Sequence, residues 1–188
     1  MHSFKKNAMG SMRTFEIAFV GLKPGVHEFN YELDTQFFKD KAGDSNEGIV
    51  ANVKLSLVKN NGFMLLKFVV GGNAEVNCDR CGNQINVDLW DEFKMVVKLT
   101  EDPQKANEEE EDADIFYIAK SESHIEISDL LYEFVMLSIP TQHVCGNDSN
   151  GQSTCNKDVL KKLEAMQVKT EEQQGNSIWK GLEKFKNN

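Results

Sequence analysis

Apolar residues occupy every second position along most of residues 13–99, and this pattern constrains the fold more than any other feature of the chain. Successive side chains of a strand point to opposite faces of a sheet, so such alternation predicts half-buried strands. The alternating segments are 13–20, 26–33, 47–58 and 85–99, and 63–70 is a thick apolar segment that is also interpreted as a strand. One short helix is predicted among them, at 34–41 with Asp34 as its N-cap. Because no helices separate the other strands, the sequence predicts an antiparallel meander.

Turn residues between the alternating segments indicate how the strands are connected. The sequence Leu-Lys-Pro-Gly at 22–25 predicts a hairpin between the first two segments. Asn-Asn-Gly at 60–62 predicts a tight turn between the next two, and Gly71-Gly72 predicts a bend or a bulge.

The apolar period changes after residue 128, where the sequence becomes helical. Short strands are predicted at 115–118 and 125–127, and an amphipathic helix then begins at Ser128 as N-cap and ends before Pro140. A second helix is predicted after the N-cap Asn156, then a polar linker at 169–176 and a last short helix at 178–185. The predicted fold class is therefore α+β: an antiparallel sheet, open or closed into a barrel, followed by two or three C-terminal helices.

Most of the negative charge lies in one segment. The net charge is −9, and residues 101–114 hold eight carboxylates against one lysine, which is −7 of that total. This segment is nearly free of apolar residues, so a disordered acidic loop is expected near 101–113. The loop is either a solvated insertion or an electrostatic contact for a basic partner. The overall charge argues against generic binding to nucleic acid or to a membrane surface.

Four cysteines carry the clearest chemical signal. Cys78 and Cys81 form a Cys-x-x-Cys knuckle followed by glycine, which allows both thiolates to reach one Zn²⁺ ion at about 2.3 Å. Cys145 and Cys155 supply two further ligands, and His143 is a spare. The alternatives are four free thiols, or a redox pair. A thioredoxin-like pair would lie at a helix N-terminus, whereas this knuckle lies between two predicted strands.

The remaining features place the chain among cytoplasmic, non-enzymatic proteins. Residues 1–11 are interpreted as an expression scar before a natural start at Met12, and 12–188 as a single domain. Without an apolar leader or a membrane-length apolar run, we expect a cytoplasmic protein with reduced thiols. Nucleotide-binding, zinc-protease and serine-hydrolase motifs are absent from the sequence, so no catalytic residue and no small-molecule substrate are predicted.

With these features in order, the chain resembles the bacterial YceD family, the large ribosomal RNA subunit accumulation proteins. The segments that carry the resemblance are Phe15-Glu16-Ile17, Gly21-Leu22-Lys23-Pro24-Gly25, Cys78-Asp79-Arg80-Cys81, the acidic stretch after Leu99, Leu131-Tyr132-Glu133-Phe134, Leu137-Ser138-Ile139-Pro140 and Trp179-Lys180-Gly181-Leu182-Glu183. The resemblance covers nearly the whole chain from Met12 and implies that it forms a single YceD-like domain.

The resemblance implies a non-enzymatic role in large ribosomal subunit biogenesis. The implied partner is a ribosomal protein or a large-subunit precursor, and the net charge leaves only weak or indirect contact with RNA. The family's knuckle maps onto Cys78 and Cys81, whereas Cys145 and Cys155 are assigned by spacing alone. Two other functions stay open: a thiol-dependent redox enzyme that uses Cys78 and Cys81, and a zinc-stabilised interaction module unrelated to ribosomes.

Overall fold

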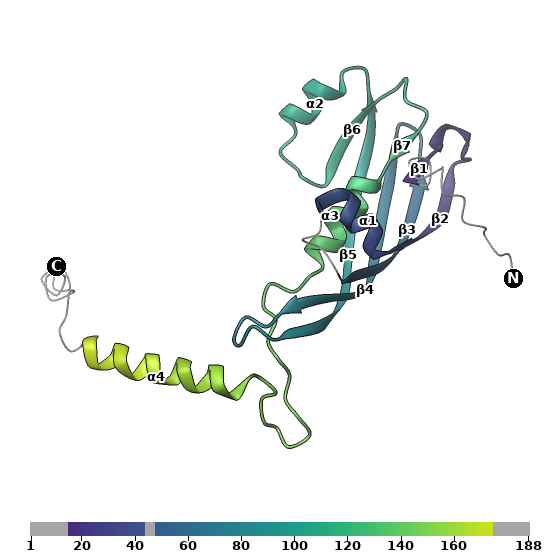
Figure 1. The fold of residues 1–188 in the computed structure, drawn as a ribbon. Helices are drawn as coiled ribbons and strands as arrows, with labels where there is room; N and C mark the ends of the chain where they lie inside the picture. Colours follow the sequence, from purple (N-terminus) through teal and green to yellow (C-terminus); the bar gives the residue numbers. More distant parts are fainter. Residues whose placement is uncertain (1–14, 44–47, 175–188) are drawn as a thin grey trace, which may run out of the picture. The chain divides into compact units, whose positions relative to one another are not determined.

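The computed structural model describes residues 15–43 and 48–174, with side chains described as far as 166 (Figure 1). The chain divides into two compact units. The sheet unit comprises residues up to 75 together with 86–140, and the cysteine unit comprises 76–85 together with the chain from 141 onward. The bounds of the domain expected over 12–188 stay a prediction.

An open five-stranded sheet forms the sheet unit. Its order is β2-β3-β4-β5-β6. The strands are β2 (Gly25–Leu33), β3 (Ile49–Lys59), β4 (Phe63–Asn77), β5 (Gln84–Thr100) and β6 (Ile115–Ala119). β2 pairs with β3, and β3 with β4, in antiparallel register. The predicted α+β class is confirmed, with the sheet open rather than closed into a barrel.

Two strand pairings differ from the sequence prediction. β1 (Glu16–Ile17) pairs with β7 (Ile125–Glu126), so the predicted hairpin between the first two segments is wrong. A 3-10 turn, η2 (Phe19–Gly21), ends the first segment, and the Lys59 ammonium holds this turn by donating to the backbone carbonyls of Phe19, Val20 and Leu22.

The second difference lies at the far edge of the sheet. β6 runs parallel to β5 instead of continuing the meander. A parallel pair needs a crossover of about a dozen residues, and the acidic segment provides it.

The core lies on one face of the sheet. The buried side of β3 and β4 carries residues such as Leu55, Leu57 and Phe68, and α1 (Thr35–Ala42) and α3 (Ser128–Leu137) lie over this unit's sheet in Figure 1. The α3 residue Phe134 fixes the position of its helix, because its ring lies 4.9 Å from that of Phe68 and stacks at 4.4 Å on that of Phe93, measured between centroids.

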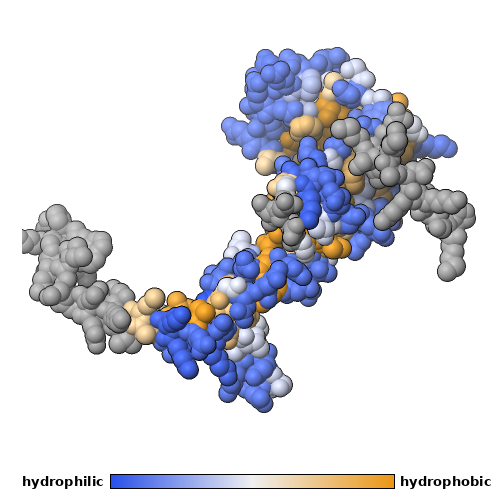
Figure 2. Space-filling model, in the orientation of Figure 1, coloured by the Kyte–Doolittle hydropathy of each residue, from blue (hydrophilic) through white to orange (hydrophobic). Residues whose placement is uncertain are grey.

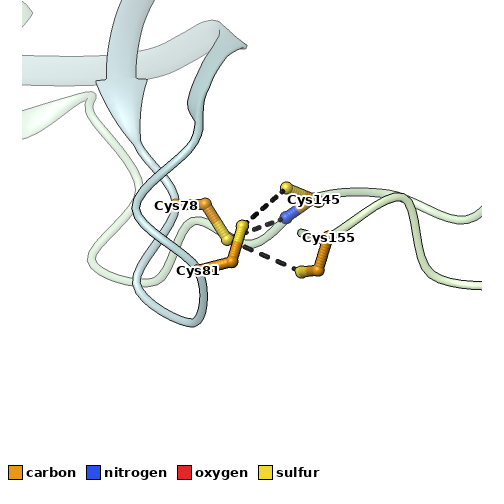
Figure 3. Close-up of side chains that lie close together, drawn as sticks. All are labelled: Cys78, Cys81, Cys145 and Cys155. Atoms are coloured by element: carbon orange, nitrogen blue, oxygen red, sulfur yellow. Dashed lines mark hydrogen bonds between the residues drawn. The ribbon is translucent and has the colours of Figure 1, made fainter. Parts of the chain in front are cut away.

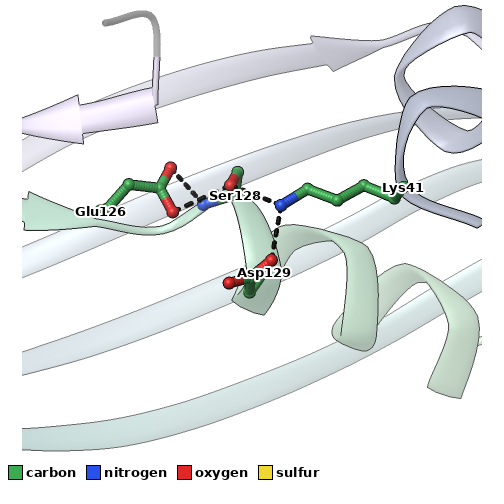
Figure 4. A network of polar contacts seen from close by, with 4 residues as sticks. All are labelled: Lys41, Glu126, Ser128 and Asp129. Atoms are coloured by element: carbon green, nitrogen blue, oxygen red, sulfur yellow. Dashed lines mark hydrogen bonds and ion pairs between the residues drawn. The ribbon is translucent and has the colours of Figure 1, made fainter. Parts of the chain in front are cut away.

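Asp34 and Ser128 were predicted to be helix N-caps. The Asp34 carboxylate accepts a hydrogen bond from the Phe37 backbone N–H, so this cap is confirmed. Ser128 is not a cap, because it is the first residue of α3 and its N-cap is Ile127. The Ser128 hydroxyl instead donates to Glu126 and accepts from Lys41, whose ammonium also pairs with Asp129 (Figure 4).

The acidic segment contains a helix where we expected a disordered loop. α2 (Pro103–Glu109) begins after Asp102, whose carboxylate accepts from the backbone N–H of Lys105. The Asn107 side-chain amide forms two hydrogen bonds of 2.8 Å with the backbone of Tyr117 in β6. These contacts hold α2 against the sheet, although its surface is strongly hydrophilic (Figure 2).

The last described helix is longer than expected. α4 (Lys157–Gln174) begins after the N-cap Asn156, as predicted, and continues through much of the segment interpreted as a linker. Residues 169–174 are mostly good helix formers, which explains the extension. The helix expected at 178–185 lies outside the described residues. Among the described helices, none is both long enough and apolar enough to cross a membrane.

Candidate metal centre

A tight turn after β4 presents the first two cysteines. The Gly82 N–H donates to the Cys78 carbonyl at 2.8 Å, and the Cys78 N–H donates to the Asn83 carbonyl at 2.7 Å. Gly82 has a φ of +74°, which a residue without a Cβ adopts without strain. The turn therefore fixes Cys78 and Cys81 in a closed knuckle, as the spacing of the motif predicts.

A second turn brings the other two cysteines together. Asn147 and Ser153 form an antiparallel bridge, and the Thr154 N–H donates to the Gly146 carbonyl. At the tip, the Asp148 carboxylate accepts from the backbone N–H groups of two later residues. Because the chain folds back on itself here, Cys145 and Cys155 come close to each other in spite of their wide spacing.

The four sulfur atoms converge on one point. All of them lie within 4.8 Å of one another (Figure 3). The Sγ atoms of Cys78 and Cys155 are 3.9 Å apart, and those of Cys81 and Cys145 are 3.6 Å apart. Four sulfurs bound tetrahedrally at about 2.3 Å from a zinc ion would be separated by about 3.8 Å. The side chains present therefore match the donor set and the dimensions of a zinc site.

The four cysteines are buried, and apolar residues pack around them. Each cysteine is 9% exposed or less, and Ile85, Val159 and Leu160 pack against the four. All four are free cysteines rather than disulfide partners. Since Leu160 and Val159 belong to the first turns of α4, the cluster also anchors the start of that helix.

The electrostatics of the cluster favour a bound cation. Burial raises the pKa of the Cys78 thiol, but hydrogen bonds from backbone N–H groups, including that of Cys145 at 3.3 Å, outweigh burial and lower the pKa to about 6. Burial and the neighbouring thiols raise the pKa of Cys145 to about 12. The cluster by itself cannot hold four thiolates together, whereas a divalent cation at its centre would stabilise all four.

His143, which the sequence offers as a spare metal ligand, contacts Asp79 in the structure. Its Nδ1 lies 3.1 Å from an Asp79 carboxylate oxygen, and its backbone N–H donates to the other carboxylate oxygen at 2.8 Å. Asp79 also donates its own N–H to the His143 carbonyl. Asp79 thus joins the two cysteine-bearing segments. The sequence did not predict this role, although an aspartate inside the Cys-x-x-Cys knuckle could have indicated a hydrogen-bond acceptor close to the site.

The positions of the cysteines also bear on redox chemistry. The knuckle lies between β4 and β5, and not at the N-terminus of a helix. The knuckle is thus not the strand-to-helix arrangement of a thioredoxin-like motif, although the backbone N–H of Asn156, before α4, lowers the pKa of the Cys81 thiol. The sequence argument about this context is confirmed.

Comparison with protein families identifies the family of this chain. The family model described as "Large ribosomal RNA subunit accumulation protein YceD" matches residues 66–186, which is more than half of the chain and includes all four cysteines. The chain belongs to the YceD family. The resemblance noted in the sequence is thereby confirmed. Comparison of this YceD chain with curated proteins and with solved structures gave no significant match.

Proposed function

We propose that this YceD protein is a non-enzymatic factor for large ribosomal subunit biogenesis, which supports accumulation of the subunit's rRNA through contacts with protein or ribonucleoprotein. The observation that carries the proposal is the family match, whose description names this process. The partner would be a ribosomal protein or a large-subunit precursor in the cytoplasm. With a net charge of −9, contact with RNA would be weak or indirect.

A structural zinc ion held by Cys78, Cys81, Cys145 and Cys155 is part of this proposal. Four cysteine ligands complete a tetrahedron and leave no open position for a substrate or an activated water molecule. Such a site supplies folding energy to a small unit. In the cysteine unit, the four cysteines with Ile85, Val159 and Leu160 are the apolar cluster that the structure shows.

The same geometry argues against a thiol-dependent redox enzyme. Cys78 is 3% exposed and Cys81 is 9% exposed, whereas a redox nucleophile must be accessible to its substrate. The lowered pKa of Cys78 suits a metal ligand equally well, because the ligand is the thiolate. Alkylation separates the two functions: thiols bound to zinc react only after chelation, whereas a redox pair reacts at once.

The proposal is tested by sedimentation of a native cell extract through a density gradient at low and moderate salt, with detection of this protein in each fraction. We expect it to migrate with large-subunit precursors and to be released as salt rises, because charge contributes to the contact. Migration at the top of the gradient at every salt concentration would contradict a stable ribosomal association.

A further inference from the structure

The face of the sheet opposite the helices is divided into a polar end and an apolar end. Since this face is exposed to solvent, polar side chains are expected along all of it. Polar residues do occupy most of one end, for example Asn30 beside Lys54, although the exposed side chain of Trp90 lies near them. At the other end, Val26 on β2 lies opposite Val58 on β3, and Val58 lies opposite Leu65 on β4.

The apolar end extends across the remaining strands. Val96 on β5 lies opposite Ile115 on β6. Leu65 keeps 41% of its surface exposed and Val26 keeps 63%, although both lie within strands. Exposed apolar groups that gather in this way on a solvent-exposed face are typical of an interaction surface.

Part of this apolar end is hollowed into a groove of about 490 Å³. We name it the sheet groove; its apolar lining includes Val58, Leu65, Met95, Val96 and Ile115, and its charged lining is Lys67, Lys94, Asp112 and Asp114.

The charges of the sheet groove are unequal. Lys67 forms an ion pair of 2.8 Å with Glu92, so its charge is already compensated. In the described part of the chain, neither Asp112 nor Asp114 forms an ion pair, and Lys94 contributes the one opposing charge. Both aspartates belong to the segment 101–114 that carries −7. The side of the groove formed by Asp112 and Asp114 is therefore negative, beside an apolar floor.

We propose that the sheet groove binds a lysine- or arginine-rich segment of a partner protein, whose aliphatic side chains cover Leu65 and whose basic side chains lie against Asp112 and Asp114. This inference rests on the proposed function and names the surface and the chemistry of the partner. RNA fits less well, because its phosphates would face carboxylates and the lining holds no aromatic ring for base stacking.

The test uses the full-length protein with a photo-crosslinking amino acid at position 65, mixed with proteins extracted from purified large ribosomal subunits. A second preparation carries the same group at position 52, on the polar end of the same face. We expect position 65 to crosslink to a lysine- or arginine-rich segment, identified by mass spectrometry, and position 52 not to. Equal crosslinking from both positions, no crosslink from position 65, or crosslinks to a second copy of the chain would overturn the proposal.

Affinity for the crosslinked partner is then measured with two matched variants. Leu65→Ser removes the centre of the groove floor and should weaken binding about tenfold or more. Val50→Ser, an exposed valine on the same face outside the groove lining, should leave binding unchanged. Asp112→Asn with Asp114→Asn should weaken binding and reduce its salt dependence. Equal affinities for Leu65→Ser and Val50→Ser would contradict the assignment.

The same variants distinguish failure of this inference from failure of the proposed function. If Leu65→Ser still sediments with large-subunit precursors as the unaltered protein does, the surface is wrong and the function stands. If the unaltered protein does not sediment with precursors, the function is wrong, whatever position 65 contacts.

Discussion

At the scale of single residues, the cysteine unit depends on side chains that the sequence places far apart. Cys78 and Cys81 were predictable as a pair, because a Cys-x-x-Cys knuckle followed by glycine is a local signal. Their meeting with Cys145 and Cys155 was a hypothesis, since it requires the turn at Asp148 and the contact between Asp79 and His143. Such long-range contacts leave no periodic trace in a sequence.

The zinc proposal makes a prediction for each ligand. Changing Cys78 or Cys155 to serine removes a thiolate, so zinc content should fall from about one ion per chain to nearly none. His143→Ala is the matched control and should retain the metal, because the imidazole lies against Asp79 and the backbone hydrogen bonds between residues 143 and 79 remain in the variant. Native mass spectrometry of protein purified without chelator measures both. Loss of zinc from the His143 variant, or zinc-free unaltered protein, would contradict the four-cysteine site.

The neighbouring residues Gly71 and Gly72 differ in the space that each leaves for a side chain. A Cβ at Gly72 would lie 2.2 Å from the Val50 carbonyl oxygen, and the φ of Gly72 is +152°. A Cβ at Gly71 would meet nothing within 4 Å. We expect Gly72→Ala to destabilise the protein by about 3 kcal/mol and Gly71→Ala to change the free energy of unfolding by less than about 0.5 kcal/mol. Chemical denaturation checks this, and equal values would refute the close approach.

At the scale of elements, sequence patterns predict the long strands well and the short strands and their pairing poorly. Alternation located β3, because a strand of that length repeats its pattern many times, and an apolar run after Asn-Asn-Gly located the start of β4. The pair β1 and β7 has only two residues in each strand, too few for a pattern, and its pairing depends on the fold around it. Gly72 was expected to mark a bend or bulge; its register with Ala51 is regular, and it instead accommodates the neighbouring strand.

The contact between α2 and β6 explains why the acidic crossover is ordered. Asn107→Ala would remove both side-chain hydrogen bonds to Tyr117, so we expect faster amide hydrogen exchange across residues 103–119, with a local loss of about 1–2 kcal/mol. Gln104→Ala is the matched control, since the Gln104 side chain is exposed and its amide donates to Glu108 on the same helix. Equal exchange in the two variants would show that Asn107 does not hold the helix.

The contact between Asn107 and Tyr117 also covers part of the edge of the sheet. β6 is the last strand of the sheet order, and an edge strand offers unpaired backbone groups to other chains. The Asn107 amide occupies the N–H and the carbonyl of Tyr117. The crossover therefore protects this edge while it carries the acidic charge to the rim of the sheet groove.

At the scale of the whole molecule, the chain combines a sheet unit that offers an apolar and acidic surface with a cysteine unit suited to one metal ion. This combination is typical of an assembly or adaptor protein, and the family description supplies the process. We therefore propose a role in large-subunit rRNA accumulation that depends on contacts with protein or ribonucleoprotein.

The most direct test is the ratio of large-subunit to small-subunit rRNA in cells depleted of this protein and then supplied with defined variants. We predict that depletion lowers the ratio, that the unaltered chain restores it, and that Cys78→Ser with Cys155→Ser fails to restore it while His143→Ala succeeds. An unchanged ratio after depletion would contradict the central claim.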